Sequence, residues 1–222
     1  MIIVHHLNNS RSQRVLWLLE ELEIPYEIKH YQRDAKTMLA PSALKKVHPL
    51  GKSPVITDGD ITVAESGAII DYLVSTYGNG RLLPSSSEDH RRYTYWLHYA
   101  EGSAMMPLLL TLIFNQMPKA PMPFFVRPIV SGIADKVKQQ FVNPQLRLHL
   151  DYIEGELKKN EWFAGREFSA ADIQMSFPVE AASSRGGIRQ THPRMMAFLE
   201  KIQSRPAYRR ALEKGGPYDF AS

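Results

Sequence analysis

The stretch His48-Pro-Leu-Gly-Lys-Ser-Pro-Val-Ile56 decides the fold of this chain, together with Glu65-Ser-Gly-Ala-Ile-Ile70 shortly after it. In the first segment, Pro54 leads into a short run of β-branched residues, which is typical of a strand that begins at a turn. A cis Ser53-Pro54 bond would turn the backbone N–H and C=O of Ser53 outward, where they can pair with an extended peptide. This segment therefore predicts a docking edge for a peptide.

The second segment places an acid and a hydroxyl, Glu65 and Ser66, at the start of a helical pattern over residues 66–77. Ser66 is expected to cap this helix, whose N–H groups and positive dipole end attract a carboxylate. Glu65 offers a counter-charge for an ammonium group. The pair suits the head group of an α-amino acid.

The residues around these segments predict an α/β unit. Residues 2–7 read as a buried strand and residues 26–31 as a second one, and the helix expected over 12–23 between them implies parallel pairing. Asp58-Gly59-Asp60 separates two short β-branched runs and predicts a hairpin. The order βαβ followed by ββα is that of a thioredoxin-like domain.

Turn-forming residues at 81–87 separate this unit from a second half in which only helical patterns follow. Long helices are expected over 88–117 and 124–159, with a proline-rich break between them. Ser169-Ala-Ala-Asp172 is a capping-box pattern that starts a buried helix. The predicted organisation is a thioredoxin-like domain at 1–80, a linker at 81–87 and an all-α domain at 88–222.

Composition excludes several classes of function. The chain has no cysteine, so disulfides, thiolate zinc sites and a thioredoxin-type dithiol are impossible. Its net charge of +4 comes from basic residues scattered among acids, which argues against nucleic-acid binding. The most apolar segment, residues 104–114, is too short to span a membrane. The histidines lack metal-ligand spacing, and we expect no metal site; those considered are His5, His6, His48, His90, His98, His149 and His192.

With these motifs in hand, the chain resembles a cytosolic glutathione transferase over nearly its whole length. It is most similar to the fungal and bacterial branch with Ser-Arg in the active-site turn and a His-Pro-Leu-Gly-(Lys/Arg)-Ser-Pro segment. The resemblance implies a cis Pro54 and a glutathione site formed by Lys52, Ser53, Pro54, Glu65 and Ser66. Lys52 is expected to hold the glycine carboxylate of glutathione.

The resemblance also implies a hydroxyl beside the glutathione sulfur, at Ser10. The alternative is structural: Ser10-Arg-Ser-Gln13 is itself a capping-box pattern, so Ser10 or Ser12 can cap the first helix. Both roles are compatible, and Arg11 and Asn9 are rival partners for the sulfur. Arg14 is interpreted as a structural residue that pairs with acids inside the first domain.

In this family the helix after the linker lines the pocket for the second substrate, which makes Ser103, Met105 and Met106 candidates there. Base rates favour a core role for such residues. Glu101 is expected to reach across a dimer interface to the partner's glutathione ammonium. The implied assembly is a homodimer.

The predicted function is that of a cytoplasmic glutathione transferase, which binds glutathione as the thiolate and transfers it to an electrophilic apolar acceptor or reduces a peroxide with it. The alternative is a non-catalytic module of the same fold that binds glutathione or a hydrophobic ligand in stress responses or partner binding. Small molecules and a second copy of the chain are the expected partners, with no nucleic acid, membrane or metal.

Overall fold

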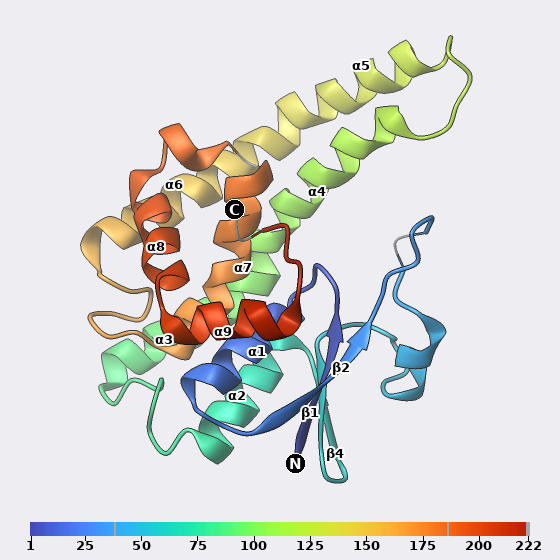
Figure 1. The fold of residues 1–222 in the computed structure, drawn as a ribbon. Coiled ribbons are helices and arrows are strands. Elements are labelled where there is room, and N and C mark those ends of the chain that lie inside the picture. The colour runs from blue at the N-terminus through green and yellow to red at the C-terminus, as the bar shows by residue number, and fades with distance from the viewer. Residues whose placement is uncertain (38, 186, 221–222) are drawn as a thin grey trace.

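The computed structural model describes residues 1–37, 39–185 and 187–220 of the chain. Its N-terminal part is a four-stranded sheet with helices packed on one side (Figure 1). The elements in chain order are β1 (Ile2–Leu7), α1 (Ser12–Glu21), β2 (Tyr26–Tyr31), β3 (Val55–Asp58), β4 (Ile61–Ala64) and α2 (Ser66–Tyr77). They confirm the predicted βαβ and ββα order.

The sheet has the strand order β2-β1-β3-β4. β1 runs parallel to β2, as the intervening helix predicts, and antiparallel to β3. The β3–β4 hairpin closes where Asp58 pairs with Ile61, and Gly59 has a φ of +57°, a value that glycine adopts without steric cost. Val55 at the start of β3 pairs with Ala64 at the end of β4, so the turn before β3 and the start of α2 lie close together at one edge of the sheet.

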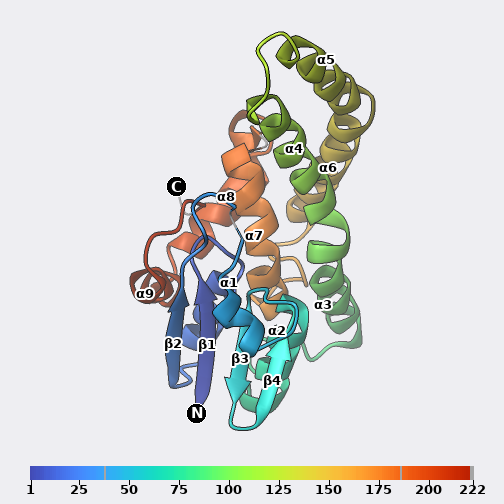
Figure 2. The ribbon, with the colours of Figure 1, turned by 90° about the vertical axis from the view of Figure 1, so that its right-hand side faces the viewer.

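The rest of the chain is helical. Its helices are α3 (Ser87–Tyr99), α4 (Met105–Gln116), α5 (Arg127–Val137), α6 (Asn143–Lys159), α7 (Ala170–Arg185), α8 (Pro193–Gln203) and α9 (Pro206–Gly215). A π-helical turn, η2 (Ala100–Ala104), joins α3 to α4, and another, η4 (Lys138–Val142), joins α5 to α6. Figure 2 shows the sheet at one end of the molecule and the α4–α5 hairpin at the other. The domain limits at 81–87 stay a prediction.

The continuous helix Ser87–Lys119 is longer than the apolar segment recognised in the sequence. By length and composition alone it is long enough and apolar enough to cross a membrane, with a mean hydropathy of 1.2 over 18 residues. The core helix of a soluble protein passes the same test, and 44% of that window is buried inside this fold.

Helix α1 differs in length from the helix predicted over residues 12–23, and it is buried along most of its length. It ends at Glu21 rather than at residue 23, and every residue from Ser12 to Glu20 is buried. The helix lies between the sheet and the helical part, where it packs against α2, α7 and α9. At the α9 crossing a Cβ on Gly215 would lie 2.5 Å from Gln13 Oε1 and 2.9 Å from Leu16 Cδ1, so a larger residue there would require these side chains to shift. Packing on both sides therefore fixes the chain segment that follows β1.

The capping box at the start of α7 forms in a modified way. Asp172 accepts hydrogen bonds from the Ser169 N–H at 2.8 Å and from the Ser169 hydroxyl at 3.0 Å. It also accepts one from the Phe163 N–H at 2.8 Å. The carboxylate thus joins the start of α7 to the preceding loop.

Candidate functional site

A cavity of about 260 Å³ lies between the turn before β3 and the start of α2. The predicted residues Lys52, Ser53, Pro54, Glu65 and Ser66 all line it. The other lining residues are Arg11, His48, Leu50, Ala64 and Glu101. The fold therefore brings the two predicted segments together and adds the β1–α1 turn and the helical part of the chain.

The Ser53-Pro54 bond is cis, as expected from the resemblance. The Ser53 hydroxyl donates to the His5 carbonyl oxygen at 3.1 Å, which ties this turn to β1. Lys52, one residue earlier, is exposed at the cavity. The turn presents one positive charge and the Ser53 backbone to the same space.

Glu65 and Ser66 meet the cavity in a different arrangement from the predicted one. Glu65, not Ser66, is the N-cap residue of α2, with φ +73° and no capping hydrogen bond from its side chain. A positive φ is costly for glutamate and is found chiefly where the surroundings enforce it. The expected cap by Ser66 is wrong, because its buried hydroxyl faces inward to Arg14. The start of α2 has no side-chain cap, which leaves its N–H groups available to an anion.

Arg14 is the residue that sequence reasoning placed wrongly. Its side chain is 1% exposed, and its acidic partner is Glu101 of the helical part, not an acid of the first α/β unit. It donates to the Gln174 carbonyl oxygen at 2.5 Å, to Ser66 Oγ at 3.0 Å and to Glu101 Oε1 at 2.5 Å. The sequence could have indicated this role, because Arg14 stands beside the apolar residues Val15 and Leu16 in α1, and a buried guanidinium requires partners.

Glu101 lies in the π-helical turn η2, a kind of irregularity that is common at functional sites. Its carboxylate pairs with Arg14 and, at 3.0 Å, with Arg11 Nε of the same chain. Burial alone would raise the pKa of Glu101, but the Arg14 and Arg11 guanidiniums outweigh burial and hold this pKa below its usual range. The single chain therefore contains two carboxylates at the cavity, those of Glu65 and Glu101.

The Ser10 hydroxyl is buried beside the cavity rather than in its lining. It lies 2.7 Å from Ser12 Oγ and 3.4 Å from Ser53 Oγ. The predicted capping box does not form: α1 starts after Arg11 without a side-chain cap, and the buried Gln13 amide has no hydrogen-bond partner within the described residues. Ser10 instead accepts a hydrogen bond from the Ser12 N–H at 3.2 Å.

The direction of the Ser10–Ser12 hydrogen bond follows from His6. Burial and the neighbouring His30 lower the pKa of His6 to about 4, so its ring is neutral at pH 7. Ser12 Oγ lies 2.9 Å from His6 Nδ1 and donates to the Leu7 carbonyl oxygen at 3.4 Å, so its proton has an acceptor other than Ser10. Ser12 can then only accept from Ser10 across their 2.7 Å contact. Ser10 must rotate its hydroxyl before it can donate to any other group.

Arg11 points into the cavity with 36% of its side chain exposed. Its Nε lies 3.0 Å from Glu101 Oε2, yet no partner within the described residues is aligned with that N–H for a hydrogen bond. Asn9 points elsewhere and lines a separate cavity of about 230 Å³ with His6 and His30. Of the three candidates in this turn, only Arg11 lines the main cavity.

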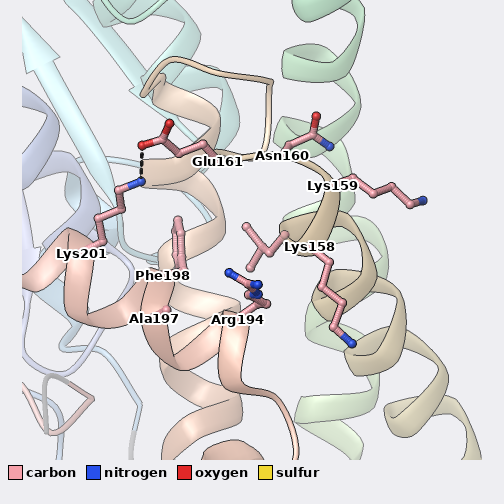
Figure 3. A pocket seen from close by; sticks show the side chains of 9 residues that line it. Lys158, Lys159, Asn160, Glu161, Arg194, Ala197, Phe198 and Lys201 are labelled. Carbon is pink, nitrogen blue, oxygen red and sulfur yellow. Dashed lines mark hydrogen bonds and ion pairs between the residues drawn. The ribbon is translucent and has the colours of Figure 1, made fainter.

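The structure does not bring the predicted second-substrate residues into this cavity. Met105 is buried in the core, Met106 is 61% exposed, and Ser103 is half-buried in η2. A third cavity, of about 360 Å³, lies between α6 and α8 and contains none of the predicted residues (Figure 3). Its basic side chains are exposed, and Lys201 is paired with Glu161 at 2.7 Å.

The sequence and the fold of this chain are similar to those of known proteins. Residues 1–75 match the N-terminal domain of glutathione S-transferases, and residues 105–206 match their C-terminal domain. Glutathione S-transferase 3 of Schizosaccharomyces pombe is 40% identical over 217 residues, covering 96% of this chain and 88% of that protein. Glutathione S-transferase 1 of Saccharomyces cerevisiae is 35% identical, covering 96% and 95%. A glutathione S-transferase crystal structure from Actinobacillus pleuropneumoniae has 32% identity and a TM-score of 0.81, covering 100% and 96%.

Proposed function

The chain belongs to the glutathione S-transferase family, and we propose that the cavity between the cis-Pro54 turn and the start of α2 is its glutathione site. The observation that carries this assignment is the convergence in one cavity of a cation, a turned backbone, a carboxylate and a helix N-terminus. Glutathione carries two carboxylates, an ammonium, two peptide bonds and a thiol. Each of these groups has a counterpart in the cavity.

The γ-glutamyl head of glutathione is assigned to the start of α2. The Glu65 carboxylate pairs with the ammonium, and the uncapped N–H groups of α2 with Ser66 hold the α-carboxylate. The Ser53 backbone pairs with the cysteinyl residue, and Lys52 attracts the glycine carboxylate. In this arrangement Arg14 is a positioning residue, because its buried guanidinium donates a hydrogen bond to the Ser66 hydroxyl.

The sulfur is assigned to the Ser10–Arg11 turn. A thiol has a pKa of about 8.5, and lowering it by one or two units requires about 1.4–2.7 kcal/mol of thiolate stabilisation. The Arg11 guanidinium supplies this through its charge at the cavity, whereas Ser10 supplies it only after its hydroxyl turns from Ser12 toward the sulfur. Asn9 is not assigned a direct role, because its amide is used elsewhere.

The reaction is transfer of the thiolate to a second substrate. The thiolate attacks an electrophilic carbon, the new C–S bond forms and the leaving group departs with the electron pair. With a peroxide the thiolate attacks an oxygen, which releases an alcohol and leaves a sulfenic acid that a second glutathione reduces to the disulfide. The protein contributes mainly proximity and electrostatics.

Calorimetry with glutathione tests the site. Glu65→Gln keeps the shape of the side chain but removes the charge, and should raise the dissociation constant at least tenfold, the scale of a charge-assisted hydrogen bond. Glu161→Gln, in the α6–α8 cavity, is the control and should bind as wild type. An unchanged constant for Glu65→Gln places the site elsewhere.

A screen with aryl halides and peroxides separates the enzyme from a binding module. If Arg11→Met or Ser10→Ala lowers the turnover rate at neutral pH, and the rate recovers as pH rises, the substituted residue stabilises the thiolate. Tight glutathione binding without turnover on any acceptor supports the non-catalytic alternative.

We also propose that the protein is a cytoplasmic homodimer. The absence of cysteine from the chain is compatible with a reducing compartment. Large apolar side chains are exposed along α4, among them Met106, Leu109 and Ile113, and such a surface is typical of an interface. A dimer would cover apolar surface of this kind.

A further inference from the structure

The C-terminal segment that follows α9 lies against the turn between β1 and α1. Gly216, with a φ of +84°, ends the helix and redirects the chain. In Figure 1 the segment rises from α9 beside the β1–α1 turn and toward α7. Three of its residues, Tyr218, Asp219 and Phe220, make the contacts described below.

Tyr218 and Phe220 anchor the segment on α7. The Tyr218 hydroxyl donates to Glu180 Oε2 at 2.7 Å, and Glu180 is 1% exposed. Phe220 is buried, and its ring centroid lies 5.1 Å from that of Phe177. A buried carboxylate and an aromatic pair therefore fix both ends of this short segment.

Asp219, which lies between Tyr218 and Phe220, forms two hydrogen bonds with the side chain of Asn9. Asn9 Nδ2 donates to Asp219 Oδ2 at 2.8 Å, and the Asp219 N–H donates to Asn9 Oδ1 at 2.9 Å. Asn9 has a φ of +48°, a conformation that few residues other than glycine and asparagine adopt readily. The two reciprocal bonds hold the residue directly before Ser10 in that conformation.

The anchors also reach Arg11 through Phe177. The guanidinium carbon of Arg11 lies 5.2 Å from the centre of the Phe177 ring, and that of Arg14 lies 5.4 Å from it. Phe220 packs against this same ring. The segment thus supports both Asn9, through hydrogen bonds, and Arg11, through an aromatic side chain.

We propose that Tyr218, Asp219 and Phe220 form a clasp that positions the Asn9–Ser12 turn, so that Arg11 and Ser10 face the sulfur of bound glutathione. This inference rests on the proposed function. The clasp residues do not touch the ligand cavity themselves and act through Asn9 and Phe177.

The test compares Asp219→Ala with Asp219→Asn in the full-length protein. Asp219→Ala removes the acceptor for Asn9, and kcat at neutral pH should fall about ten- to a hundredfold, the scale on which misplaced reacting groups are felt. The KM for glutathione should change less than about twofold, because Glu65 and the start of α2 are untouched. The apparent pKa in the kcat–pH profile should rise by about one unit. Asp219→Asn keeps an acceptor oxygen and should restore most of kcat.

Glu161→Ala is the matched control, since it also removes one exposed, hydrogen-bonded carboxylate, and its kcat and pH profile should equal those of wild type. Equal profiles for Asp219→Ala and wild type overturn the clasp. So does a lower kcat that Asp219→Asn fails to restore, or one that Glu161→Ala reproduces.

Hydrogen–deuterium exchange distinguishes failure of the clasp from failure of the proposed function. Amides of the Asn9–Ser12 turn should exchange at least about tenfold faster in Asp219→Ala than in wild type, whether or not a substrate is present. Unchanged exchange overturns the clasp. If wild type does not bind glutathione in calorimetry, the proposed function fails, and faster exchange in the variant still supports the hold on the turn.

Discussion

Replacement of Arg14 by methionine should test the central structural claim, that one buried guanidinium ties the α/β part to the helical part at the site. The side chain is 1% exposed and donates hydrogen bonds to Gln174, Ser66 and Glu101. Methionine fills a similar volume without a charge or donors. The variant leaves the Gln174 carbonyl and the Ser66 hydroxyl buried without this donor.

The magnitude follows from these groups. Each buried polar group left without a partner costs about 1–3 kcal/mol, and breaking a buried ion pair costs about 3–5 kcal/mol. Glu101 is 30% exposed, so water relieves part of the unpaired charge. We therefore expect the free energy of unfolding to fall by about 3 kcal/mol, a large share of the 5–15 kcal/mol that typical domains possess.

Urea unfolding followed by tryptophan fluorescence measures this loss, with the m-value checked for constancy. Arg147→Met is the control, because the Arg147 side chain is 84% exposed and its ion pair, from Nε to Asp151 Oδ2, is long at 3.7 Å. This substitution should lower the free energy of unfolding by less than about 0.5 kcal/mol. Arg14→Lys keeps the charge without the planar fork and should fall between the two. If Arg14→Met and Arg147→Met unfold with equal free energies, the reasoning about Arg14 is refuted.

Three further predictions concern other parts of the molecule. Burial raises the pKa of Glu180 from 4.5 to about 7, so this group takes up a proton on folding. Its contribution to the free energy of unfolding should fall by up to about 3 kcal/mol as pH rises from 4.5 to 7. Glu180→Gln should abolish that fall, and equal pH slopes in denaturant titrations would contradict the assignment. Light scattering at micromolar concentration should give about twice the 25.3 kDa chain mass, whereas a fully active monomer would exclude the dimer. Lys52→Ala should weaken glutathione binding no more than about fivefold, because an exposed charge pair contributes little; a larger loss in calorimetry would mean that Lys52 is desolvated in the complex.

Glu101 lies at the cavity and is paired within its own chain. Within the chain its carboxylate pairs with Arg11 and Arg14, and its service to a partner's ligand stays a prediction. The π-helical turn η2 directs it there. A carboxylate so placed balances the charge of Arg11, which keeps that guanidinium oriented at the cavity.

The sequence by itself determined the local elements and the two site-bearing segments. Alternation and turn residues predicted β1, β2 and the β3–β4 hairpin, because side-chain direction in a strand and the φ values of a turn depend on neighbouring residues. The Glu65-Ser66 pair was predicted as an acid and a hydroxyl before a helical pattern, whereas the cis Pro54 bond was implied by the family resemblance. Each of these local features depends on residues that lie within a few positions of one another in the sequence.

Only the tertiary structure decided which side chains meet across the molecule. Arg14 and Glu101 are 87 residues apart, and Asn9 and Asp219 are 210 residues apart. Such pairs depend on how α1 is packed between the sheet and helices α7 and α9, and no spacing rule within one element specifies that packing. The expected cap by Ser66 was wrong for the same reason. A hydroxyl can satisfy its hydrogen bonds locally or with a distant partner, and here burial of the Arg14 guanidinium beside it favoured the distant one.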